Sequence, residues 1–124
     1  MKALLVAVAL LGCNREQPER KPAAVKAVVA RPAQLAHVTI KALGMYCEES
    51  CPMRVRYALA NNPAVYELGF DVANESIFVS YDATLGPAKQ VTKPMLVAIK
   101  QAGFDPWLAK EEWPADAKVQ LVVR

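Results

Sequence analysis

The spacing of apolar side chains changes several times along this chain, and the succession of spacings restricts the fold. Residues 37–42 alternate between polar and apolar side chains, which is typical of a half-buried strand. Gly44 interrupts this pattern. Pro52 has no backbone N–H, which suits the first position of a helix, so we predict a helix from Pro52, with Cys51 as N-cap, that stops before residues 61–63.

Two further alternating segments are separated by a short polar turn. Every second residue is apolar in residues 66–72 and again in residues 77–81. Residues 73–76, with the sequence Ala-Asn-Glu-Ser, join the two segments. We therefore predict a hairpin-like pair of strands, followed by a loop over residues 82–91.

A second helical pattern and a last strand complete the order. Thr92 is the expected N-cap of a helix that stops at Gly103. Residues 104–108 form the expected last strand, in which Pro106 is tolerated only at a sheet edge. The resulting order is that of the ferredoxin-like βαββαβ sandwich, an α+β fold with a four-stranded antiparallel sheet and two helices on one face.

The size and charge of the chain exclude several kinds of function. A length of 124 residues provides for one small domain. The formal net charge of +3, without a lysine and arginine run interleaved with aromatic residues, argues against a nucleic-acid partner. No glycine-rich phosphate loop and no Ser/His/Asp set occurs in the sequence, so we expect no enzymatic activity.

The first residues have the features of an export signal. Lys2 precedes an unbroken apolar run over residues 3–11, which suits a signal peptide and is shorter than the roughly 20 residues of a membrane-spanning helix. Residues 10–13, Leu-Leu-Gly-Cys, resemble the lipobox of bacterial lipoproteins. The resemblance implies a signal peptide over residues 1–12, lipidation of Cys13 and a place in the cell envelope. A plain signal peptide with an incidental cysteine is the alternative.

Two segments flank the predicted domain, which spans residues 37–110. Residues 13–36 are rich in proline, alanine and charge, and we interpret them as a flexible tether, with a short helix or strand over residues 23–30 as the alternative. Residues 111–124 contain Trp113 and a short apolar run. This C-terminal extension is expected to add a strand or to pack across the sheet.

Two of the three cysteines lie between the first predicted strand and helix. The thiolate is the form that binds metals, and a position at a helix N-terminus lowers the pKa, so Cys51 should ionise more readily than Cys47. Two soft thiolates without a nearby histidine favour Cu(I) over Zn(II), which takes four ligands; the only histidine, His37, is expected on the polar face of a strand. Charged neighbours shift the pKa of these thiols in opposite directions, because positive charge favours the thiolate and negative charge disfavours it. They are Arg54, Arg56, Glu48 and Glu49.

Residues 37–110 resemble the heavy-metal-associated domain of copper chaperones, metal-transporting P-type ATPases and mercury-binding periplasmic proteins. The resemblance rests on the order of strands and helices and on a set of positions around the cysteines. These positions are Gly44, Met45, Cys47, Cys51, Val55, Gly103 and Phe104. The cysteine spacing departs from the Cys-x-x-Cys that is usual in the family, because residues 48–50 give Cys-x-x-x-Cys.

The resemblance implies a function in metal handling. Cys47 and Cys51 would hold the ion, with Cu(I) preferred and Zn(II) or Hg(II) as alternatives, while Gly44, Met45 and Phe104 would support the loop. The domain would carry or buffer the ion and pass it by thiolate exchange to a metal-transporting ATPase domain or another envelope metal protein. It would act as a monomer or as a metal-bridged dimer, held at the membrane by its lipid anchor.

Two other functions remain open from the sequence. In an exported domain, Cys47 and Cys51 could form a disulfide that staples the loop of an interaction module without metal. The other alternative is a thiol–disulfide redox protein, although neither the cysteine spacing nor the strand order is that of a thioredoxin-like protein.

Overall fold

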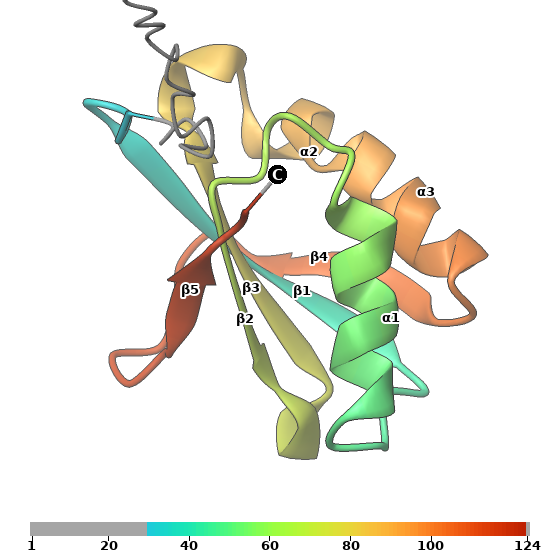
Figure 1. Ribbon diagram of the computed structural model, residues 1–124. Helices are drawn as coiled ribbons and strands as arrows, with labels where there is room; N and C mark the ends of the chain where they lie inside the picture. The colour runs from blue at the N-terminus through green and yellow to red at the C-terminus, as the bar shows by residue number, and fades with distance from the viewer. Residues whose placement is uncertain (1–29, 124) are drawn as a thin grey trace, which may run out of the picture. The chain divides into compact units, whose positions relative to one another are not determined.

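Five antiparallel strands form one sheet in the computed structural model, which describes residues 30–123. The order across the sheet is β4-β1-β3-β2-β5 (Figure 1). The first four strands confirm the predicted ferredoxin-like arrangement, and a fifth strand from the C-terminal extension widens the expected four-stranded sheet. The strands are β1 (Leu35–Leu43), β2 (Glu67–Asp71), β3 (Ser76–Asp82), β4 (Asp105–Lys110) and β5 (Val119–Leu121).

The predicted leader lies outside the described residues. The same holds for the lipidation site Cys13 and for most of the predicted tether. Strand β1 begins at Leu35, two residues before the predicted start at His37. Among residues 30–123, no helix is long and apolar enough to cross a bilayer.

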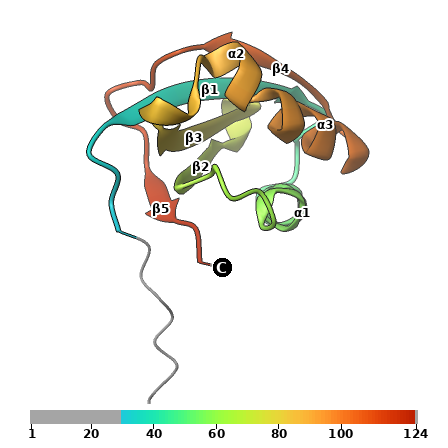
Figure 2. The same cartoon turned by 90° about the horizontal axis from the view of Figure 1, so that it is seen from above.

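Two longer helices, α1 and α3, cover one face of the sheet, as predicted (Figure 2). A one-turn helix, α2, lies within residues 82–91, which we expected to be a loop throughout. That expectation was wrong because four residues are too few to show a helical spacing of apolar side chains. The helices are α1 (Ser50–Leu59), α2 (Ala88–Val91) and α3 (Lys93–Gln101), with 3-10 turns η1 (Val72–Asn74) and η2 (Ala83–Leu85).

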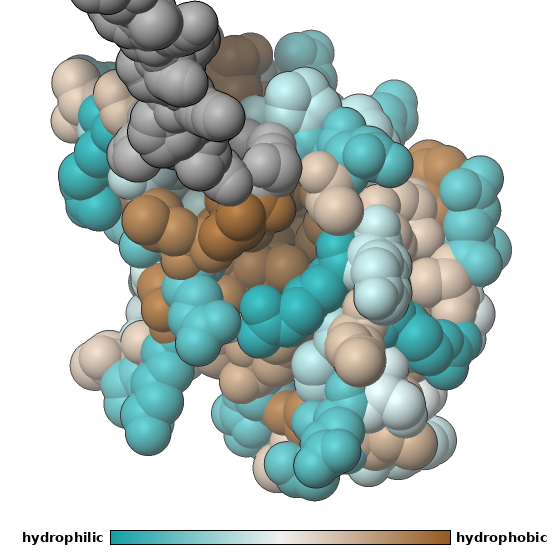
Figure 3. Space-filling view, viewed as in Figure 1, coloured by the Kyte–Doolittle hydropathy of each residue, from teal (hydrophilic) through white to brown (hydrophobic). Residues whose placement is uncertain are grey.

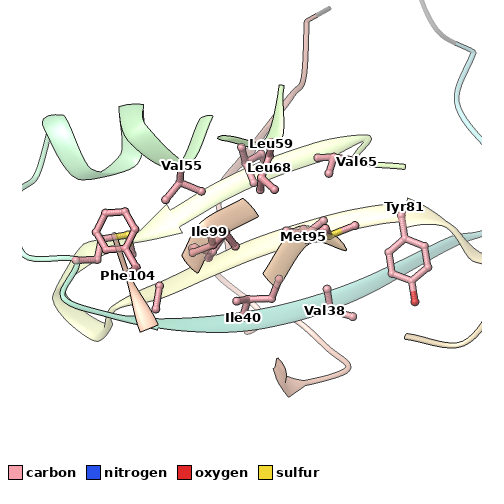
Figure 4. Packing of buried hydrophobic residues seen from close by; sticks show 14 of the residues in the cluster. Val38, Ile40, Val55, Leu59, Val65, Leu68, Tyr81, Met95, Ile99 and Phe104 are labelled. Carbon is pink, nitrogen blue, oxygen red and sulfur yellow. The ribbon is translucent and has the colours of Figure 1, made fainter. Parts of the chain in front are cut away.

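The hydrophobic core lies between the sheet and the two longer helices (Figure 4). Ile40 of β1, Val55 of α1 and Ile99 of α3 are all completely buried. Because side chains alternate along a strand, the apolar half of β1 faces the helices. Phe104 lies at one end of this core and Tyr81 at the other (Figure 4).

Helix α1 begins two residues earlier than the sequence predicts. It starts at Ser50, with Glu49 as N-cap, so the prediction of a start at Pro52 with Cys51 as N-cap was wrong. The first N–H groups of a helix have no acceptor within the helix, so proline is tolerated throughout the first turn and does not mark its first residue. The earlier start places Cys51 inside the first helical turn.

The C-terminal extension crosses the outer face of the sheet before it forms β5. There the indole of Trp113 donates a hydrogen bond from Nε1 to the carbonyl oxygen of Val38, at 3.0 Å. Its ring centroid lies 4.3 Å from that of His37 and 6.5 Å from that of Phe78. His37 is therefore on the outer face, as predicted, but it is half-buried beneath the indole.

Strand β5 pairs with β2 along the edge that a four-stranded sheet would leave open (Figure 1). Val119 lies opposite Gly69, and Leu121 lies opposite Glu67. A β-carbon on Gly69 would collide with the carbonyl oxygen of Lys118. Glycine in the middle of β2 therefore permits the close approach of the extension.

Candidate metal site

The loop that holds the cysteines joins β1 to α1 and starts at Gly44. This residue has φ +100°, a conformation that glycine adopts at low cost. Its N–H donates a hydrogen bond of 2.8 Å to Oε2 of Glu75, which ties the start of the loop to the turn between β2 and β3. Met45 is completely buried, whereas Tyr46 is 77% exposed. The loop is thus fixed to the core at its start and open to solvent farther along.

The two thiols of the loop differ in accessibility. Cys47 is exposed, whereas Cys51 has 3% of its surface exposed in the first turn of α1. The backbone N–H of Cys47 donates to Sγ of Cys51, with 3.3 Å between nitrogen and sulfur. Both cysteines are free thiols. The site therefore combines a thiol that another molecule can reach with one that is enclosed by its own loop.

The environment of Cys51 favours its thiolate. Burial raises the pKa of this thiol, because the charged form loses hydration. Hydrogen bonds from the backbone and side chain of Cys47 and from the backbone of Tyr46 lower it, and the positive charge of Arg54 lowers it further. The favourable interactions outweigh burial, so the pKa of Cys51 lies below its ordinary value of 9.0. The sequence alone left the direction of this net shift open, because positive and negative neighbours oppose each other.

The residues predicted to support the loop lie around its start. Phe104 is 5% exposed, and its Cδ1 is 3.7 Å from the position that a β-carbon on Gly44 would take. Met45 belongs to the same buried cluster as Phe104. The contribution of Gly44, Met45 and Phe104 to metal binding stays a prediction.

The candidate sulfur donors of the loop are the thiols of Cys47 and Cys51. No group of three or more histidine, cysteine, aspartate or glutamate side chains in residues 30–123 is placed to hold a metal ion. His37 contacts Trp113 in a tilted arrangement at the outer face of the sheet, and Met53 is half-exposed on α1. Two soft thiolates fit Cu(I), whereas Zn(II) would lack two of its usual four ligands.

Sequence reasoning missed two contacts that hold the loop. The carboxylate of Glu75 accepts a hydrogen bond from Gly44, which lies 31 positions earlier in the chain. Glu75 itself has φ +49°, a backbone conformation that residues other than glycine rarely adopt. The guanidinium of Arg54 donates to the carbonyl oxygen of Ala102 and lies over the ring of Phe104. Both charged residues can be read from the sequence, but no local sequence pattern indicates which distant residues they contact.

The observed fold and site together define a class: a ferredoxin-like α+β domain with two thiols at the junction of β1 and α1. Solved structures with this fold include a copper-binding domain of the P-type ATPase HMA7, which is 24% identical, with a TM-score of 0.52 over 63% of this chain and 99% of that one. The N-terminal domain of a potential copper-translocating P-type ATPase from Bacillus subtilis, solved in its Cu(I)-loaded state, is 18% identical, with a TM-score of 0.54 over 68% of this chain and 100% of that one. The yeast copper transporter domain Ccc2a is 19% identical, with a TM-score of 0.50 over 62% and 99%.

These likenesses establish the fold of the chain. It is the fold of heavy-metal-associated copper-binding domains, as the resemblance in sequence implied. No protein-family model matches the sequence, and the comparison with curated proteins gave no match either.

Proposed function

We propose that this domain binds Cu(I) through Cys47 and Cys51 and carries or buffers the ion. The observation that carries the proposal is the pairing of an exposed thiol with a buried thiol of lowered pKa in one loop. The buried thiolate of Cys51 would act as a lasting ligand, because its loop encloses it. The thiolate of Cys47 would act as the exchangeable ligand, because it is open to solvent. The domain serves as a metal-binding module and not as an enzyme.

Transfer of the ion would proceed by thiolate exchange at Cys47. A thiolate of the partner forms a new sulfur–copper bond while the bond from Cys47 breaks, and copper remains Cu(I) throughout. The proton released by the incoming thiol is balanced by the proton that the freed Cys47 takes up from solvent. Exposure of the loop beyond Met45 gives the partner access to this sulfur.

We further propose that a lipid on Cys13 anchors the chain in the cell envelope and that the receiving partner is a metal-transporting ATPase domain or another envelope metal protein. The lipobox-like residues 10–13 support the anchor. The likeness in fold to ATPase domains supports the kind of partner. The domain would act as a monomer or as a dimer that shares one ion through four thiols, and Zn(II) or Hg(II) are alternative ions.

The test is competition for Cu(I) between the reduced protein and a chromophoric chelator. The Cys47→Ser, Cys51→Ser double variant is the control, because serine keeps the size of each side chain and removes the soft donor. We expect tight one-to-one binding by the unmodified protein and none by the double variant. Equally weak competition by both proteins would refute the proposal.

The structure also bears on the disulfide alternative. The backbone nitrogen of Cys47 lies 3.3 Å from Sγ of Cys51, so the loop brings the two cysteines close together. A disulfide between them would remove both donors. Mass spectrometry of alkylated protein from the envelope, without added reductant, measures the fraction of each form. An oxidised resting protein that binds no Cu(I) even after reduction would make the stapled interaction module the better account.

A further inference from the structure

Arg54 occupies a fixed place next to the buried thiol. It lies three positions after Cys51 on α1, so both side chains are on the same side of the helix. Its guanidinium carbon is 4.5 Å from the ring centroid of Phe104, and its Nη2 donates to the carbonyl oxygen of Ala102. A β-carbon on Gly103 would collide with the same Nη2. The turn between α3 and β4 therefore holds the positive charge in place.

The charge of a two-thiolate complex depends on the ion that it holds. A monovalent ion with two thiolates leaves one net negative charge, whereas a divalent ion with two thiolates is neutral. A fixed positive charge stabilises the first complex and has little effect on the second. A positive side chain at this position can therefore discriminate between ions by charge, in addition to any discrimination by softness.

The other charges near the loop do not provide this balance. Arg56, on the same helix, lies over the ring of Phe70 of β2, with 5.2 Å between its guanidinium carbon and the ring centroid. Glu48 and Glu49 follow Cys47 directly and add negative charge to the loop. Arg54 thus lies on the same side of α1 as Cys51, where its positive charge favours the thiolate, whereas Arg56 lies over Phe70.

We propose that Arg54 balances the negative charge of a monovalent ion held by Cys47 and Cys51, and so biases the site toward Cu(I) over divalent ions that accept the same two sulfurs. The inference rests on the proposed function. It assigns to this arginine a part in selectivity that the two cysteines, which bind both kinds of ion, do not have.

The test compares Cu(I) with Hg(II), which also binds two thiolates, in the reduced full-length protein. Affinities are measured by competition for the unmodified protein and for Arg54→Gln, Arg54→Lys and Arg56→Gln. We expect Arg54→Gln to lower the ratio of Cu(I) to Hg(II) affinity by roughly five- to ten-fold, and high salt to shrink that difference, because Arg54 is exposed and its field is screened. Arg54→Lys keeps the charge and should keep most of the ratio.

Arg56→Gln is the matched control, since it removes the same charge from the same helix and should leave the ratio unchanged. The ratio within one variant is independent of any loss of folded protein. Equal weakening of both ions in Arg54→Gln, or an unchanged ratio, would overturn the inference while leaving the proposed function intact. Failure of the unmodified protein to bind either ion would overturn both.

Discussion

Replacing Trp113 by alanine removes the side chain that fastens the C-terminal extension to the sheet. The indole is half-buried against His37 and Phe78 and hydrogen-bonded to the backbone of Val38. Loss of about 100 Å² of buried apolar surface costs about 2.5 kcal/mol, and the hydrogen bond contributes about 1 kcal/mol. In a domain of this size, a total of about 3.5 kcal/mol lowers the melting temperature by about 10–20 °C.

The assay is thermal and urea unfolding of the reduced protein, followed by far-ultraviolet circular dichroism. Trp107→Ala is the control, because the other tryptophan of the chain is 43% exposed on β4 and should cost less than about 1 kcal/mol. Equal melting temperatures for the two variants would refute the reasoning that the extension is part of the folded domain. Cu(I) affinity should be unchanged in Trp113→Ala under conditions where it is folded, because the indole lies on the face of the sheet opposite α1.

Three further predictions concern β5 and the thiols. Gly69→Val should separate β5 from β2, because the new side chain would occupy the place of the Lys118 carbonyl, and hydrogen exchange should then show faster exchange of the amides in residues 119–121. The folding stability of the reduced protein, compared with that of Cys51→Ser, should rise with pH up to about 9.0. Folding lowers the pKa of Cys51, so its thiolate stabilises the native state fully above the pKa of the unfolded chain. That contribution is lost as the pH falls through the pKa of the folded protein. Equal pH profiles in urea titrations would contradict it. Iodoacetamide should modify Cys47 before Cys51 in the folded protein, because the second thiol is buried, and peptide mapping that finds equal modification would contradict the burial seen here.

The order of strands and helices could be predicted because each element carries its own local pattern. Alternation fixed β1 and the pair β2 and β3, and the stop at Gly103 agrees with its φ of +106° just past α3. Helix boundaries were less predictable, since Pro52 is compatible with several positions in the first turn. Helix α2 was missed because it has a single turn.

The site could be predicted only in part, because its cysteines are close in sequence and its supporting contacts are not. The position of Cys51 at a helix start indicated a readily ionised thiol. The N–H of Cys47 as its hydrogen-bond donor, the carboxylate of Glu75 on Gly44 and the place of Arg54 over a distant ring all depend on tertiary packing. Gly69 was a signal for the fifth strand that sequence reasoning did not use, since glycine inside a strand indicates close approach of another backbone.

The surface between α1 and β5 is a shallow apolar groove of about 370 Å³ (Figure 3). Its walls include Met53 and Tyr57 of α1 and Leu121 of β5, which are all exposed. It shows that the extension shields one edge of the sheet at the cost of new exposed apolar surface.

The fifth strand also determines how this protein meets other copies of itself. An unpaired strand edge can recruit an edge from another molecule and start aggregation. Here β2 is covered, the new edge at β5 is only three residues long, and the opposite edge at β4 contains Pro106, which has no N–H to offer. Within residues 30–123 the open edges of the sheet are thus a three-residue strand and a strand that contains a proline, which limits sheet-to-sheet association between crowded molecules.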